Sequence, residues 1–174
     1  MVADNRVFEL DSQVVYRGKP MRVAGRMLLE GASGQSTFRY MLTEESGAPV
    51  VLEQASASKY ALLRPFPSAA RPPTSGNTIM VGVERYTLVG VRRLKVLEVL
   101  GQVPGSLARG ELLLSGMFEG LMGTLMRELV PGTDRQVYYL VRAVETGDML
   151  SAEAHAAARE AESRAAGADA ADED

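Results

Sequence analysis

The chain has 174 residues, of which 46% are hydrophobic, and a net charge of −3. It contains no cysteine, which excludes disulfide bonds, thiol catalysis and cysteine-bound metal centres. No apolar run has the length of a signal peptide or a membrane span. We therefore expect a soluble, cytoplasmic protein without a transmembrane segment.

The first predicted unit covers residues 1–64. Alternating apolar and polar residues and short turn sequences predict strands at about 13–16, 21–29, 37–43, 49–54 and 58–63. The alternation places Met21, Val23 and Met27 on one face of the second strand, and arginines on the other. Residues 65–76, rich in proline, are expected to form an extended linker.

The second predicted unit covers residues 77–146 and repeats the pattern of the first. Residues 14–29 and 79–94 share an apolar triplet, a polar turn and an alternating strand, and Gly25 and Gly90 are identical. Further strands are expected at about 78–83, 86–93, 94–100, 110–114 and 136–144, although Leu94 to Leu100 could form a helical turn. The shared pattern predicts two tandem small half-barrels, similar to Src-homology-3 barrels.

Residues 116–130 are predicted to form an amphipathic helix inserted in the second unit, because their apolar residues recur at helical spacing. This stripe is expected to fill the core, and the alternative is a surface for a partner or a membrane. The candidate partner stripe consists of Met117, Phe118, Leu121, Met122, Leu125 and Met126.

The C-terminal region, residues 147–174, differs in composition from the rest of the chain. Ser151 is expected to cap an Ala- and Glu-rich helix that continues to about Ala166, and a disordered acidic tail follows. Residues 1–145 carry 17 basic and 14 acidic residues, whereas residues 146–174 carry 2 and 8. The chain therefore combines a mildly basic body with an acidic tail.

Basic residues lie around the same hairpin in both units and form the candidate binding surface. They are Arg17, Lys19, Arg22, Arg26, Arg85, Arg92, Arg93 and Lys95. Such residues could contact phosphates, with tyrosines available for stacking, which makes nucleic-acid binding an alternative function. The acidic tail and a pI of about 5.3 count against it.

Residues suited to catalysis are few. His155 is the only histidine and lies in the alanine-rich tail, so metal sites and histidine-based triads have no support. Glu119 and Glu128 would be about 13 Å apart along a helix, too far for one acid–base site. We expect no cofactor, no metal and no enzymatic activity, and we keep a carboxylate and arginine enzyme as the least favoured alternative.

Three segments resemble a bacterial family called domain of unknown function 4178. They are the strands beginning at Val14, at Phe38 and at Gly47, the last ending at Glu53. The resemblance covers about residues 10–145, although the chain lacks the tryptophan that such proteins commonly place before the position of Tyr40. It implies a bacterial setting linked to membrane stress and polyamines, and it implies no catalytic residues.

The leading hypothesis is a non-enzymatic protein-binding or scaffolding protein, an accessory of a bacterial membrane-stress system. Its partner would be another protein or a second copy of the chain. Peripheral association with a membrane stays open.

Overall fold

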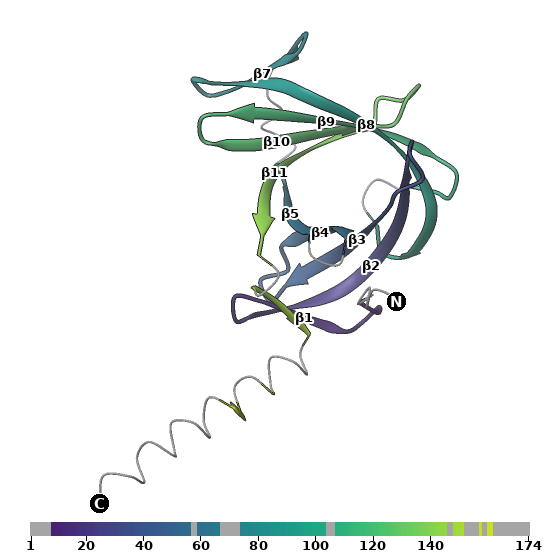
Figure 1. Cartoon of the computed structure of the whole chain (residues 1–174), viewed down its shortest axis with the longest axis vertical. Helices are drawn as coiled ribbons and strands as arrows, with labels where there is room; N and C mark the ends of the chain where they lie inside the picture. Colours follow the sequence, from purple (N-terminus) through teal and green to yellow (C-terminus); the bar gives the residue numbers. More distant parts are fainter. Residues whose placement is uncertain are drawn as a thin grey trace, which may run out of the picture.

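A computed structural model describes residues 8–56, 59–66, 74–103, 107–145, 148–151, 157 and 160–161. Its elements are strands, which Figure 1 shows in order along the chain. They are β1 (Gln13–Tyr16), β2 (Lys19–Gly31), β3 (Ser36–Glu44), β4 (Pro49–Ser56), β5 (Lys59–Pro65), β6 (Thr74–Ser75), β7 (Thr78–Val81), β8 (Glu84–Gly101), β9 (Leu112–Gly120), β10 (Gly123–Leu129), β11 (Gln136–Val144) and β12 (Met149–Ser151). The protein is thus mainly β, as predicted.

Eight of these strands close into one antiparallel barrel, visible as a ring in Figure 1. Its order is β2-β3-β4-β5-β11-β10-β9-β8, and β8 pairs with β2 to complete the circle. Strands β1 and β12 extend the sheet beside β2, while β7 and β6 extend it beside β8. The prediction of two tandem small barrels is wrong, because strands from both halves of the chain share one barrel.

Strands β2 and β8 are long and bent, and each takes part in two sets of pairings. The first residues of β2 pair with β1, and Gly25–Gly31 pair with β8. The pairing of β2 with β3 is irregular between Val23 and Gly25, and that of β8 with β9 is irregular between Leu88 and Gly90. Strands β7 and β8 begin 65 residues after β1 and β2, and their irregularity has the same offset. Bulges of this kind bend a strand, which lets the sheet curl in opposite directions along its length.

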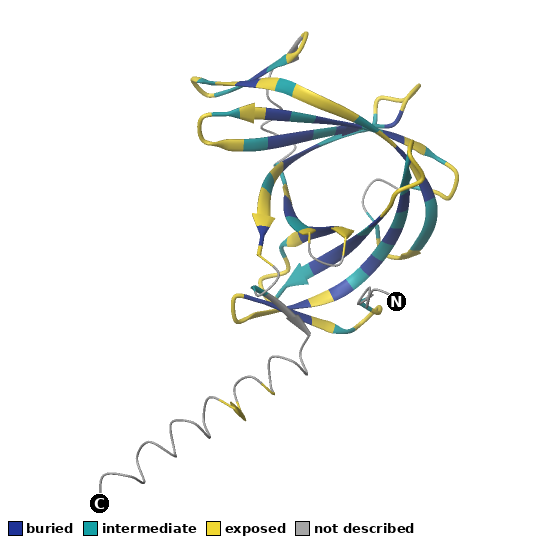
Figure 2. Ribbon diagram, in the orientation of Figure 1, coloured by how far each residue is buried: buried dark blue, intermediate teal, exposed yellow. Residues whose placement is uncertain are grey.

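The bends divide the apolar side chains among several clusters, and dark blue positions alternate along the strands in Figure 2. One cluster fills the barrel interior and contains Met27, Met41, Val51, Leu63, Met126 and Tyr139. A neighbouring interior cluster joins Leu29 to Leu94, Val96, Leu113 and Val130. Two more lie outside the barrel, one in each half of the chain. Leu42 belongs to the first outer cluster and Phe118 to the second.

The predicted helix at residues 116–130 is wrong, since this segment contains most of β9, a tight turn and β10. Leu121 and Met122 form the turn, and Gly120 pairs with Gly123. Phe118 pairs with Leu125, and the spacing that suggested a helical face also suits two strands folded back on each other. Gly123 has a φ of 150°, which side chains rarely allow and which favours glycine at the turn.

Other expectations are corrected or fall outside the described residues. Residues 86–100 lie in one continuous strand, β8, which excludes a helical turn there, and the strand expected at 110–114 is β9. Ser151 ends β12 instead of capping a helix; the rest of the predicted C-terminal helix and tail, apart from residues 157 and 160–161, is not described. The same is true of residues 67–73 in the predicted linker. No helix in the described part could cross a membrane.

Gly25 is expected to be essential for barrel closure. A Cβ atom at this position would overlap the carbonyl oxygen of Gln102, whereas a Cβ atom at Gly90 would meet nothing within 4 Å. Gly25→Ala should lower the free energy of unfolding by about 1–3 kcal/mol or more, because the obstacle is backbone. Gly90→Ala is the matched control and should change it by less than about 1 kcal/mol. Urea unfolding followed by circular dichroism measures both, and equal effects would contradict this account of closure.

Candidate functional site

Half of the predicted basic surface is occupied by ion pairs. Arg17 pairs with Asp148 at 3.1 Å, Arg22 with Asp11 at 3.0 Å, Arg26 with Glu98 at 3.0 Å and Arg92 with Glu53 at 3.1 Å. These partners come from segments distant in sequence, so their positions could not be read from the spacing of the arginines. The pairs weaken the attraction of this surface for phosphate groups.

The remaining basic residues are exposed but do not form one surface. Lys19 and Arg85 lie beside the turns of two different hairpins, and Arg93 and Lys95 lie in the middle of β8. No ion pair links these four side chains to another described residue. Nucleic-acid binding through the basic residues stays a prediction.

The candidate partner stripe is divided among three environments. Met117 and Met126 pair with each other and pack in the barrel interior. Phe118 and Leu125 are fully buried in the outer cluster of the second half. Only Leu121 and Met122, in the turn between β9 and β10, are exposed, at 99% and 84%. The structure therefore reduces this stripe to one apolar turn.

A charged network that the sequence did not reveal lies inside the barrel. Arg39, on β3, is buried and contacts Glu53 on β4 and Glu128 on β10. Alternation along β3 places Arg39 on the same face as Met41 in the interior. An arginine at an inward position was the available signal, because such a residue needs buried carboxylate partners.

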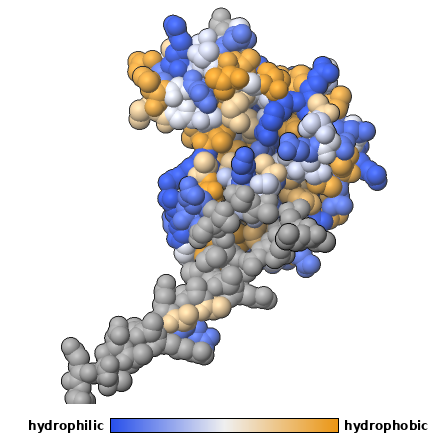
Figure 3. Space-filling model, in the orientation of Figure 1, coloured by the Kyte–Doolittle hydropathy of each residue, from blue (hydrophilic) through white to orange (hydrophobic). Residues whose placement is uncertain are grey.

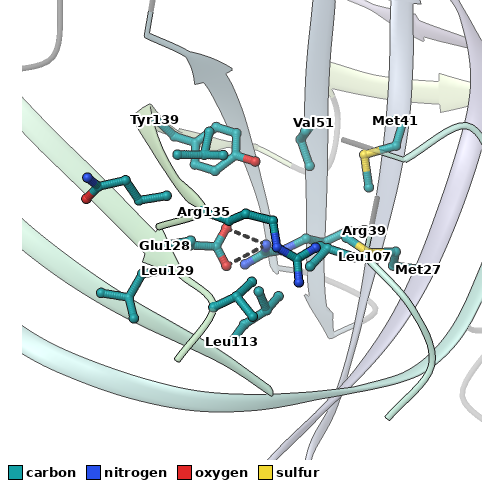
Figure 4. A pocket seen from close by; sticks show the side chains of 13 residues that line it. Met27, Arg39, Met41, Val51, Leu107, Leu113, Glu128, Leu129, Arg135 and Tyr139 are labelled. Atoms are coloured by element: carbon teal, nitrogen blue, oxygen red, sulfur yellow. Dashed lines mark hydrogen bonds and ion pairs between the residues drawn. The ribbon is translucent and has the colours of Figure 1, made fainter. Parts of the chain in front are cut away.

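Arg39 binds both carboxylates at short distances. Its Nη1 donates to both oxygens of Glu128, at 2.6 and 2.8 Å, as the dashed lines of Figure 4 show. Its Nε donates to Glu53 Oε2 at 2.9 Å, and Nη2 lies 2.7 Å from the same oxygen. Arg92 enters from β8 and donates to Glu53 Oε1 at 3.1 Å. Two arginines and two glutamates thus balance their charges.

Charge attraction opposes burial in this network. Burial acts to lower the pKa of Arg39, but the attraction of Glu128 and then Glu53 outweighs it and raises this pKa above its usual value. Burial acts to raise the pKa of Glu53, and the nearby Arg39 and Arg92 more than compensate, so this pKa lies below its usual range. Both carboxylates are engaged with arginine, and neither is free to act as a general acid or base in this arrangement.

A small cavity of about 40 Å³ lies beside the network at one end of the barrel (Figure 4). Arg39, Glu128 and Tyr139 line it together with apolar side chains from several strands and Leu107. Arg135, at this end, pairs with Glu111 at 2.5 Å. The described residues include no group of three or more histidines and carboxylates suited to a metal ion, and His155 lies outside them.

Comparison of the chain with protein-family models, curated proteins and solved structures finds no match. The resemblance to domain of unknown function 4178 therefore stays a prediction from the sequence.

Arg39→Met is expected to destabilise the protein strongly. The change leaves Glu128 without its partner and Glu53 with Arg92 alone, and breaking a buried ion pair typically costs about 3–5 kcal/mol. Arg92→Met is the control, because Glu53 keeps Arg39 and the Arg92 side chain is 38% exposed. Urea unfolding of both variants gives the two losses of stability. Equal losses, or none with Arg39→Met, would contradict the central role of Arg39.

Stability is expected to fall in acid partly through Glu53. Its folded pKa lies below the unfolded value of about 4.3, so the unfolded chain takes up the proton first as the pH falls. The contribution is complete above pH ~5 and is lost as the pH falls toward the folded pKa. In Glu53→Gln, the free energy of unfolding should depend less steeply on pH below ~5, although the variant is less stable at pH 7. Urea titrations from pH 3 to 7 measure this, and an unchanged slope would contradict it.

Proposed function

We propose that the protein is a non-enzymatic binding protein that recognises another protein through an apolar tip on its second half. The tip consists of Val83, Leu121 and Met122 and lies on two turns, β7–β8 and β9–β10. Val83 is fully exposed, as Leu121 nearly is. Single exposed apolar residues are common, but three large ones on adjoining turns indicate a contact surface.

Strand pairing holds the two turns of the tip side by side. Thr87, near the start of β8, pairs with Glu119, near the end of β9. The Glu84 carboxylate accepts hydrogen bonds from the backbone N–H of Met122 and from the Tyr86 hydroxyl. Figure 2 colours the turns as exposed, and apolar surface gathers over this end of the molecule in Figure 3. The tip is thus a supported projection from the barrel.

The corresponding turns of the first half are polar. Arg17 and Gly18 join β1 to β2, and Glu45, Ser46 and Gly47 lie between β3 and β4. Hairpins of the same arrangement therefore need no apolar residues at their tips. This contrast is the observation that carries the proposal.

The charges around the tip favour a protein over a membrane as the partner. Arg85 and Glu119 are both exposed beside it, so an anionic lipid surface would meet opposite charges. Three side chains are too few for a complete interface of about 1,200–2,000 Å², but they suit the anchors that enter an apolar pocket of a partner. A bacterial membrane-stress system is the setting that the sequence resemblance suggests for that partner.

Site-specific cross-linking should identify the partner at the tip. The chain has no cysteine, so Leu121→Cys can carry one photoreactive maleimide, and Glu45→Cys places it on the corresponding turn of the first half. We expect one protein to be cross-linked in cells from position 121 and not from position 45. The affinity of that protein, purified, for the unlabelled chain should fall at least about tenfold with Leu121→Ser/Met122→Ser, since anchor residues dominate binding.

A variant altered elsewhere provides the comparison. Val89→Ser/Leu112→Ser removes two exposed apolar residues from outside the tip and should leave the affinity unchanged. Equal losses with both double variants would contradict the proposal. So would binding of the tip to anionic vesicles, or to a second copy of the chain, in place of a separate protein.

A further inference from the structure

An apolar groove lies at one end of the barrel, beside the small cavity next to Arg39. It has a volume of about 420 Å³, within the range of small-molecule sites. Its lining comes from β2 to β5, from β11 and from the segment after β8, and is largely apolar. Met41, Val51, Val137 and Tyr139 belong to the walls of both the groove and the cavity, so the two spaces adjoin.

Tyr139 supplies an unused polar group to this wall. Its side chain is 5% exposed, yet its hydroxyl makes no hydrogen bond with any described residue. A buried hydroxyl without a partner is costly and calls for an explanation. In Figure 4 the hydroxyl points across the space between Val51 and Arg39, which places a hydrogen-bond donor inside an apolar site.

The charges near Tyr139 select an uncharged ligand. The carboxylates of Glu53 and Glu128 are already bound to arginine, and the arginine at the mouth, Arg135, is paired with Glu111. Burial raises the pKa of Tyr139, which keeps its hydroxyl protonated as a donor at neutral pH. The site therefore offers an apolar surface, one O–H donor and no free charge.

We propose that this end of the barrel binds a small, mainly apolar, uncharged molecule whose carbonyl or ether oxygen accepts a hydrogen bond from the Tyr139 hydroxyl. The apolar lining supplies most of the affinity, and the hydroxyl orients the molecule. This site is separate from the tip of the second half and does not depend on the proposed protein partner.

The fluorescent ketone prodan is a suitable probe, because it is uncharged, apolar and carries one carbonyl oxygen. Titration of the full chain should show saturable binding. Tyr139→Phe should weaken binding about three- to tenfold, as expected for one hydrogen bond. Tyr138→Phe is the matched control, because that tyrosine packs in the outer cluster and should leave the affinity unchanged. Naphthalene, which lacks the carbonyl, should compete equally well against prodan in all three proteins once each prodan affinity is taken into account.

Two further variants locate the probe. Val137→Trp fills the shared wall and should abolish binding, whereas Leu121→Ser/Met122→Ser alters only the tip and should not affect it. The proposal is overturned if the full chain shows no saturable binding, if the two tyrosine variants bind prodan equally, or if the tip variant removes binding. Because Tyr139→Phe removes one oxygen and no packing, the tyrosine comparison remains decisive even if Val137→Trp does not fold.

Discussion

Arg39 joins carboxylates from the two halves of the chain, Glu53 on β4 and Glu128 on β10. Moving these charges out of water costs several kcal/mol for each ion, and only close contacts restore that free energy. The geometry supplies them, since Arg39 approaches both glutamates within 2.9 Å. Any shift of β3 by one residue would turn Arg39 out of the interior and leave two buried carboxylates without it. The network thus selects one register and one way of closing the barrel.

The bends of β2 and β8 let a single sheet bury both of its faces. One face lines the barrel, and the other forms an outer cluster in each half, so the strands near the bends read as apolar on successive residues. Tyr40, Met41 and Leu42 are an example, with Met41 inside and its neighbours in the first outer cluster. Close contact between Gly25 and Gln102 then brings β2 and β8 together.

Local patterns predicted most of the strands because alternation and turn residues act over short distances. The hairpin at Arg17-Gly18 and the strand at 136–144 are examples. The segment at 116–130 was misread because its apolar positions satisfy both a helix and two paired strands, and the tight turn at Leu121-Met122 lacks the usual turn residues. Closure depends on long-range pairing, which no local pattern encodes.

The candidate site was harder to predict than the fold. Glu53 and Glu128 occupy corresponding places on β4 and β10, two residues after Val51 and Met126, which pair with Met41 and Met117. Their separation of 75 residues differs from the 65-residue offset of the hairpins, which hid the correspondence. Arg39 has Ser115 as its counterpart, so the arginine itself does not repeat. Two residues of the tip, Leu121 and Met122, were in the predicted stripe, for a different structural reason.

The barrel closes through only two seams between the halves, β2 with β8 and β5 with β11. Every other pairing in the barrel joins neighbouring strands of the same half. Two chains could therefore exchange halves and keep each strand pairing and the Arg39 network intact, which is the condition for domain swapping. Concentration and the connection between Phe66 and Thr74 then determine whether a seam forms within one chain or between two.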